Sequence, residues 1–212
     1  MSDDLTNFTL AARIVAALVG RPEVAEHWDD ESACAGMTVG GLANHLGDQA
    51  VLAVRLLEAG PAQEDAIGLD DHYARAAWVR EDLEGETNVA IREGSDEQAR
   101  DGQGALQERV EAAVDRFPGL METVPADTPI LVPWQGWALT AHDLLTTRLM
   151  EMVVHSDDLA ASVGVETPEF PGEVVDRVLG LLTRVAIRRH GQTAVVRALS
   201  RPQRAPASVS AF

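Results

Sequence analysis

Residues 139–163 read LTAHDLLTTRLMEMVVHSDDLAASV, and this segment has the clearest helical pattern in the chain. Its apolar side chains return every three to four residues, which is the period of an amphipathic α-helix, and Gly164 follows as a stop signal. The segment also carries Glu151 and His155. A spacing of four leaves two side chains only about 40° apart on one helix face, one turn above the other. This is how a single helix can offer two ligands to one metal ion.

The neighbours of this pair are mostly apolar: Leu149, Met150, Met152, Val153 and Val154. A carboxylate that is buried in such surroundings without a partner is costly, and a bound metal ion would remove that cost. The alternative is an ordinary surface pair, since Glu and His at this spacing are common on exposed helix faces. The pair alone does not decide between the two interpretations.

His45 is the best-placed third ligand. It lies in the middle of a second helix expected over residues 38–59 (TVGGLANHLGDQAVLAVRLLEA), with Thr38 as its N-cap and Gly60-Pro61 as its end. His27 and His72 are instead expected near helix ends, in polar surroundings. Three nitrogen and oxygen ligands suit Zn²⁺ with a fourth position left open, although nickel, cobalt or manganese would also fit. A metal-free core histidine is the alternative for His45.

The rest of the chain predicts further helices and almost no strand. We expect helices over 5–18, 22–28, 71–82, 86–117, 171–190 and 192–200, with a kink in the 86–117 helix at Gly94 or Gly102. A loop rich in Pro and Trp is expected at PADTPILVPWQGW (125–137). Four long helices predict an all-α four-helix bundle in residues 1–165. Residues 166–212 are expected to add short C-terminal helices packed on the bundle and a mobile tail.

The composition excludes several classes of function. The chain has 34 acidic and 17 basic residues, and the net charge of −17 opposes binding to nucleic acid or to an anionic membrane. Cys34 is the single cysteine, so no disulfide can form within the chain. No signal peptide and no apolar run of about 18 residues is seen, and we therefore expect a cytoplasmic protein without a membrane span.

Three stretches resemble the mycothiol-dependent maleylpyruvate isomerase family, within the DinB-like metalloenzyme superfamily. They are GMTVGGLANHLGDQ (36–49), TTRLMEMVVHSDDLAASVG (146–164) and HGQTAVVRALSR (190–201). The resemblance implies a DinB-like four-helix bundle, commonly a homodimer, with His45, Glu151 and His155 as the metal ligands. It also implies mycothiol as cosubstrate and a small electrophile as substrate. The characterised isomerase carries an α/β domain after the bundle, whereas we expect only helical sequence after the bundle here, which puts maleylpyruvate isomerisation itself in question.

Several other residues are candidates for contacts with the thiol or the substrate. Arg148 shares the face of Glu151 and could pair with it or bind a carboxylate, unless it extends to solvent. Asp158 could orient the imidazole of His155, unless it is a surface charge. Trp134 and Trp137 could wall the mouth of the pocket, or pack in the core.

Three further residues are considered around the same pocket. Asn88 and Arg92, one turn apart, could face it or be solvated. Cys34 is not expected to be a nucleophile, because the acidic residues around it disfavour a thiolate.

Together with the metal ligands, the resemblance implies a metal-dependent transferase or isomerase that activates a low-molecular-weight thiol. A metal ion with an open position lowers the pKa of a bound thiol, and the resulting thiolate attacks an electrophilic carbon. Addition followed by elimination gives isomerisation, whereas displacement gives thiol transfer. Two alternatives remain: a non-catalytic metal-binding bundle with a protein partner, and a metal hydrolase that uses the same three ligands.

Overall fold

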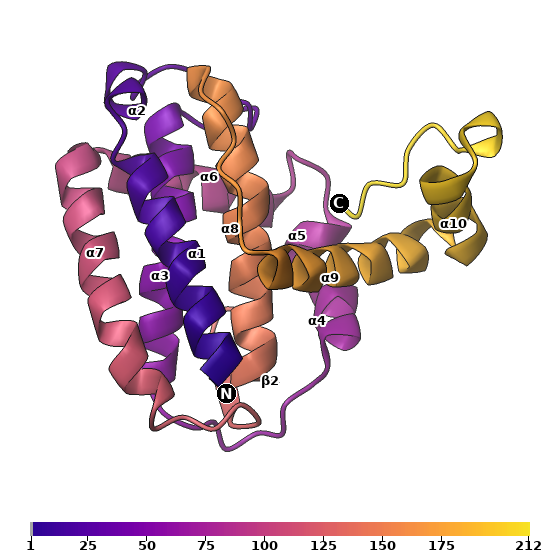
Figure 1. Cartoon of the computed structure of the whole chain (residues 1–212), viewed down its shortest axis with the longest axis horizontal. Helices are drawn as coiled ribbons and strands as arrows, with labels where there is room; N and C mark the ends of the chain where they lie inside the picture. The colour runs from indigo at the N-terminus through magenta and orange to yellow at the C-terminus, as the bar shows by residue number, and fades with distance from the viewer. Residues whose placement is uncertain (1) are drawn as a thin grey trace.

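Four long helices lie side by side and form a bundle (Figure 1). The computed structural model describes residues 2–212, and side chains from residue 6 onwards. The bundle helices are α1 (Ser2–Val19), α3 (Val39–Glu58), α7 (Gly102–Met121) and α8 (Ala141–Val163). Helices α1 and α3 each pack against both α7 and α8. The predicted all-α class and four-helix bundle are therefore confirmed.

Local capping fixes the start of the two helices that carry the candidate ligands. The hydroxyl of Thr38 accepts a hydrogen bond from the amide of Gly41 at the start of α3, and Thr140 does the same for Asp143 at the start of α8. The carboxylate of Asp96 in turn accepts hydrogen bonds from the amide and the hydroxyl of Thr38, at 3.0 and 2.7 Å. Such caps satisfy amides that have no partner within the helix.

The core lies between the four helices and contains large apolar side chains that are almost fully buried. Phe8 of α1 stacks on Phe117 of α7 with ring centroids 4.3 Å apart. Gly47 lets α3 and α7 approach closely, because a Cβ atom there would lie 2.8 Å from methyl groups of Leu106 and Val110. The tight packing keeps α3 in a fixed position relative to its neighbours.

The helix expected over 86–117 is instead two helices, α6 (Glu86–Ala99) and α7. The chain turns at Gly102, whose φ of +81° is in the left-handed region that glycine adopts without strain. Helix α7 also continues past Pro118, where a stop was expected. Proline removes only one backbone hydrogen bond, and Phe117 and Met121 on either side of it are buried in the core.

Two other local predictions are wrong. The helix expected over 71–82 is divided into α4 (Leu69–Arg75) and α5 (Ala77–Arg80). The loop expected over 125–137 contains part of a β-hairpin formed by β1 (Pro129–Val132) and β2 (Trp137–Thr140). Short apolar runs on both sides of a turn favour such a hairpin, and Gly136 allows the turn with a φ of +78°.

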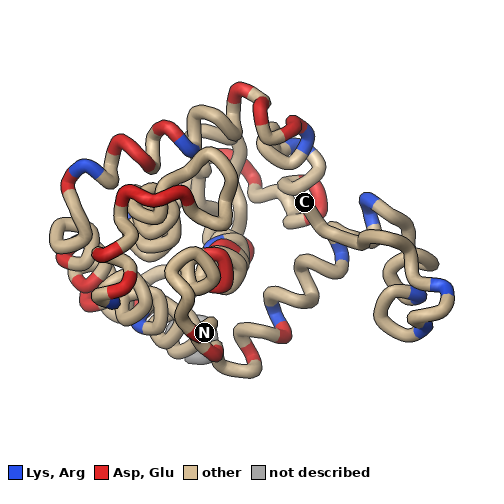
Figure 2. Tube along the Cα trace, turned by 90° about the horizontal axis from the view of Figure 1, so that it is seen from above, with Lys and Arg blue, Asp and Glu red and all other residues tan. Residues whose placement is uncertain are grey.

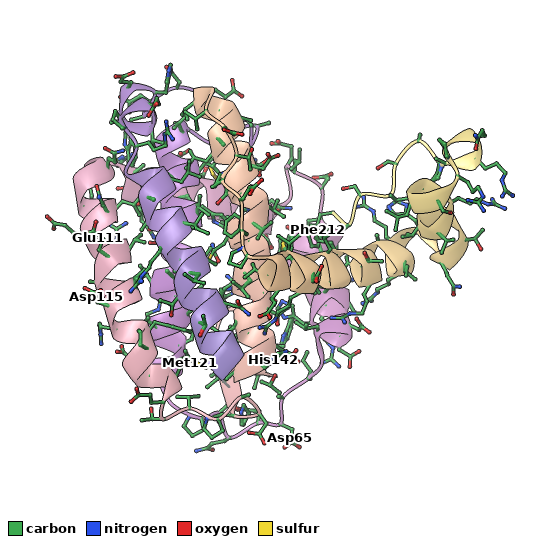
Figure 3. All side chains as sticks on the ribbon, viewed as in Figure 1. Asp65, Glu111, Asp115, Met121, His142 and Phe212 are labelled. Carbon is green, nitrogen blue, oxygen red and sulfur yellow. The ribbon has the colours of Figure 1, made fainter. Side chains whose placement is uncertain are left out.

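The C-terminal helices lie outside the bundle. Helix α9 (Gly172–His190) packs on α8, whereas α10 (Gln192–Ser200) and the short 3₁₀ helix η1 (Pro202–Arg204) extend away from it (Figure 1). The remaining helix is α2 (Pro22–Glu26). Phe212, labelled in Figure 3, returns to the main body, where its ring contacts Tyr73 and Trp78 at centroid distances of 5.7 and 4.9 Å.

Charge is distributed unevenly between these two parts. Acidic residues dominate the bundle, whereas the segment after α9 contains arginines and no acidic residue (Figure 2). No helix among the described residues is both long and apolar enough to cross a membrane.

Candidate metal centre

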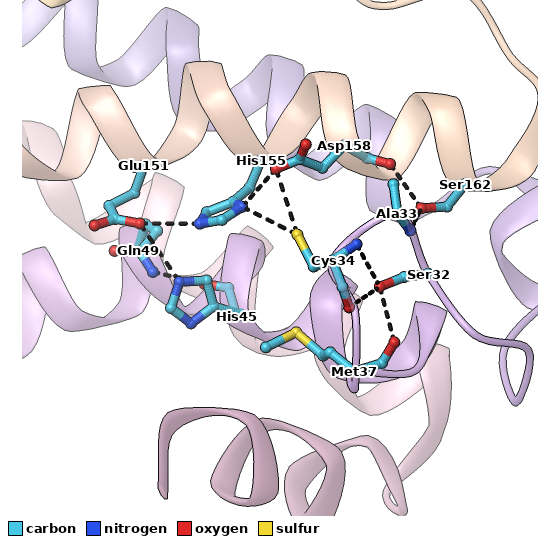
Figure 4. Close-up of polar contacts among 10 residues, drawn as sticks. All are labelled: Ser32, Ala33, Cys34, Met37, His45, Gln49, Glu151, His155, Asp158 and Ser162. Atoms are coloured by element: carbon cyan, nitrogen blue, oxygen red, sulfur yellow. Dashed lines mark hydrogen bonds and ion pairs between the residues drawn. The ribbon is translucent and has the colours of Figure 1, made fainter. Parts of the chain in front are cut away.

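Helices α3 and α8 bring the three candidate metal ligands together (Figure 4). His45 lies in the middle of α3, while Glu151 and His155 lie one turn apart on α8. The Oε2 atom of Glu151 is 3.5 Å from Nε2 of His45 and 3.1 Å from Nε2 of His155. All three potential ligand atoms lie within 4.8 Å of one another. The two histidine rings meet edge to face, with centroids 4.8 Å apart.

These separations fit a single tetrahedral cation. Bonds of about 2.0–2.1 Å from Zn²⁺ to nitrogen and oxygen place neighbouring ligand atoms about 3.3 Å apart. The two measured distances, 3.5 and 3.1 Å, lie on either side of that value. The donor set of two imidazoles and one carboxylate also suits zinc and leaves one coordination position for a further ligand. That these residues bind a metal ion stays a prediction.

The buried carboxylate of Glu151 needs a positive partner. Burial alone would raise the pKa of the Glu151 carboxyl, but hydrogen bonds with His155 and His45 hold this pKa well below its usual range. Burial alone would lower the pKa of His155, but hydrogen bonds with Asp158, Cys34 and Glu151 raise it well above its usual value. The carboxylate of Glu151 therefore stays charged, and its positive partner is either protonated His155 or a metal ion.

Asp158 holds the far side of the His155 ring. Its Oδ2 atom is 2.9 Å from Nδ1 of His155, which is the arrangement by which carboxylates orient metal-binding imidazoles. Cys34 lies at the same place: its sulfur is 3.5 Å from Oδ2 of Asp158 and 3.9 Å from Nδ1 of His155 (Figure 4). Sequence reasoning did not place Cys34 here. Cys34 and His155 are 121 residues apart in the sequence, so no local pattern could predict their contact.

Arg148 lies beside the candidate ligands. The sequence suggested that it could pair with Glu151, but the structure shows no hydrogen bond between them. Its Nη1 donates to Oε1 of Gln49 at 2.6 Å, and its Nε donates to the hydroxyl of Thr147. Gln49 in turn donates to the backbone carbonyl of His45 at 2.7 Å. The charge of Arg148 still helps to lower the pKa of Glu151. Gln49 was missed, although its position one turn after His45 on α3 places it on the same face.

Two buried rings, His72 and Tyr73, interact electrostatically with Arg148 and Glu151. The indole of Trp137 donates a hydrogen bond to Nδ1 of His72 at 3.1 Å, and His72 is 4% exposed. Burial, followed by the charge of Arg148, lowers the pKa of His72 to about 4. Burial and the charge of Glu151 raise the pKa of Tyr73. The expectation that His72 lies in polar surroundings is therefore wrong. Helix α4 turns its His72 and Tyr73 side chains toward Trp137 and the C-terminal Phe212, which bury them.

Three further candidates lie apart from the ligand cluster. Trp134 is 53% exposed in the turn of the hairpin. The amide of Asn88 donates to the carbonyls of Trp78 and Asp82. Arg92 donates to the carbonyl of Leu83 and pairs with Glu84. These hydrogen bonds brace the segment between α5 and α6, and no described contact joins any of these three side chains to the candidate ligands.

Acid should destabilise the protein through His72, and replacing His72 with glutamine should reduce this effect. With a pKa of about 4 in the folded chain and 6.5 in the unfolded chain, His72 takes up its proton more readily when unfolded. Stability is therefore lost as the pH falls from 6.5 towards 4, by about 3 kcal/mol at pH 4. Urea unfolding of wild type and H72Q at pH 7 and pH 4 measures the difference. The exposed His27→Gln variant is the control, and an equal acid loss in wild type and H72Q would contradict the assignment.

The fold and the cluster first define a class: a helical-bundle protein in which two helices present two histidines and one glutamate as potential metal ligands. The chain belongs to the family described as the mycothiol maleylpyruvate isomerase N-terminal domain, which matches residues 8–160. The match includes all three candidate ligands and ends within α8. No curated protein and no solved structure matches the chain. The resemblance found in the sequence is confirmed, and the family name links the chain to mycothiol.

Proposed function

We propose that this protein is a metal-dependent transferase or isomerase that activates mycothiol, or a similar low-molecular-weight thiol, for attack on a small electrophile. The observation that carries the proposal is the convergence of His45, Glu151 and His155 within a chain of this family. The distances between their ligand atoms suit Zn²⁺. A bound divalent cation would lower the pKa of a coordinated thiol, so that a thiolate forms at neutral pH.

The residues around the cluster have separate roles in this proposal. His45, Glu151 and His155 hold the cation, and Asp158 keeps the proton of His155 on Nδ1 so that Nε2 faces the cation. Arg148 offers a guanidinium group to a carboxylate of the thiol or the substrate. Trp137, fixed by His72, forms an apolar wall. Trp134, Asn88 and Arg92 are left out of the binding site, because Trp134 is half exposed and the other two donate to backbone carbonyls in α5 and in the segment between α5 and α6.

The proposal also covers the domain division, the oligomeric state and the cellular location of the chain. Residues 1–165 form the metal-binding bundle, and residues 166–212 form an extension that packs on it. We include a homodimer and a cytoplasmic location in the proposal because the family resemblance and the sequence favour them. A domain for a second substrate is not assigned to residues 166–212, since α9 packs on α8 and the segment after α9 is short and basic.

A thermal-shift experiment tests the function. Zn²⁺-loaded protein should be stabilised by mycothiol at about 100 times its Kd by about 2.7 kcal/mol, which corresponds to a rise in Tm of about 5–10 °C. Metal-free protein should show no rise. S-methylated mycothiol, which cannot form a thiolate, is the matched control and should give a much smaller shift. A shift that is equal with and without metal, or equal for both compounds, would contradict the proposal.

The same preparation separates transfer from isomerisation. With an electrophile that carries a leaving group, transfer consumes one thiol per product, whereas isomerisation of maleylpyruvate leaves the free thiol concentration unchanged. A protein that binds zinc but shows neither thiol response nor turnover would instead favour the non-catalytic alternative.

A further inference from the structure

The imidazole of His155 faces a different set of potential ligands on each side. Its Nε2 atom faces Glu151 and His45, and its Nδ1 atom faces Asp158 and Cys34 (Figure 4). Cys34, His155 and Asp158 form a second group whose ligand atoms all lie within 4.8 Å of one another. In the proposed function only the first side of the ring binds a cation, and Asp158 on the second side holds the proton on Nδ1. The second side contains a sulfur, a nitrogen and an oxygen donor.

The loop that carries Cys34 is held in place on α8. The hydroxyl of Ser32 donates to the carbonyl of Met37 at 2.8 Å, with the carbonyl of Cys34 as a second acceptor at 3.1 Å, and accepts from the amide of Cys34. The amide of Ala33 donates to the hydroxyl of Ser162 at 2.8 Å, and that hydroxyl donates to the carbonyl of Asp158 at 2.6 Å. The thiol therefore lies over Asp158 and His155 because the loop is bonded to the same helix, one turn further along.

The separations in this group fit a second tetrahedral ion. With zinc bonds of about 2.3 Å to sulfur and 2.0–2.1 Å to nitrogen and oxygen, the sulfur should lie about 3.6 Å from each other ligand atom, and nitrogen about 3.3 Å from oxygen. The sulfur of Cys34 is 3.5 Å from Asp158 and 3.9 Å from His155, and the latter two are 2.9 Å apart. Shifts of about 0.4 Å would reach the ideal separations.

We propose that a second divalent cation is bound by Cys34, His155 and Asp158 while the first is held by His45, Glu151 and His155, so that the imidazole bridges the two. The inference rests on the proposed function for the first cation. Binding of the second releases two protons to solvent, one from the thiol of Cys34 and one from Nδ1 of His155.

Charge balance supports the two-ion arrangement. Two carboxylates, one thiolate and one imidazolate carry four negative charges, which equal the charge of two divalent cations. The sulfur ligand favours thiophilic ions such as Zn²⁺, Co²⁺ or Cd²⁺ over Mg²⁺ or Ca²⁺. The side chain of Asp158 is 31% exposed, which leaves room for water as a further ligand.

Titration with Co²⁺ tests this proposal without any measurement of activity. Wild-type protein should bind two ions per chain, and a thiolate-to-cobalt charge-transfer band should appear in the near ultraviolet. The Cys34→Ser variant should bind one ion and lose this band, while it keeps the weaker visible bands of the first site. Glu151→Gln should keep the charge-transfer band, because Glu151 is not a ligand of the second ion. Circular dichroism checks that each variant is folded, and Cys34→Ala provides a second replacement.

The outcomes separate this proposal from the proposed function. Two ions in wild type with a band that depends on Cys34 would support the second site. A single ion without the band would overturn simultaneous binding and leave the first centre intact. A single ion with the band would lie on Cys34 and would overturn both simultaneous binding and the first centre. Two ions without a thiolate band would also overturn it, since the second ion would lie elsewhere. Failure of wild type to bind any Co²⁺ would overturn both proposals.

Discussion

Replacing Glu151 with glutamine is expected to lower the affinity of the protein for its first Zn²⁺ by more than about 100-fold, since even the residues that orient ligands contribute 10- to 100-fold. The carboxylate is the only anionic member of the His45–Glu151–His155 group, and its side chain is 13% exposed. An amide of the same size keeps the packing but provides a weaker, neutral donor. Competition with a chromophoric chelator measures the change in affinity.

The matched control for this prediction is Glu166→Gln, an exposed carboxylate just after α8. It makes the same chemical change and lowers the net negative charge by the same amount, so it corrects for long-range attraction of cations. Mycothiol should no longer stabilise E151Q at zinc concentrations that saturate the control. Equal zinc affinities for E151Q and the control would show that the cluster is only an ion-paired part of the helix interface.

Replacing Phe117 with alanine is expected to reduce the free energy of unfolding by about 3–5 kcal/mol. The ring is 1% exposed and stacks on Phe8, so its removal leaves a cavity between α1 and α7. For a chain of this size, the Tm should fall by roughly 10 °C. Differential scanning calorimetry measures the change.

Leu83→Ala is the control for the core prediction, because Leu83 is 66% exposed and should change stability by less than about 0.5 kcal/mol. Well below its Tm, F117A should still give the visible Co²⁺ spectrum of the first site, since His45 and Glu151 lie on α3 and α8. A Tm as high as that of the control would mean that the core closes over the lost ring. Loss of the cobalt spectrum in folded protein would mean that α7 positions the centre more directly than its contacts suggest.

E151Q tests metal binding and F117A tests stability, and both properties depend on the same helix bundle. The packing of α1 and α7 supports α3 and α8, and these two helices carry the candidate ligands. Gly47 permits the close approach of α3 and α7, and Thr38 with Asp96 fixes the start of α3. The position of His45 opposite Glu151 therefore depends on contacts throughout the bundle and not only on the residues of the site.

The sequence alone determined the features that follow from local periodicity. The spacing of Glu151 and His155 places them on one face of α8 whatever the rest of the chain does, because the helix repeat is a local property. The capping residues Thr38 and Gly164 were recognised for the same reason. The position of His45 in the middle of a helix made it a candidate ligand, but did not show which other helix would lie against it.

Only the tertiary structure decided which of these faces meet. Packing of α3 on α8 brings His45 to Glu151, and the loop bonded to Ser162 brings Cys34 to His155. The burial of His72 likewise depends on α4 folding inward beside Trp137. Such contacts join residues that are far apart in the chain, and they form because side chains from separate elements fill a common space. Periodicity within one helix contains no information about that space.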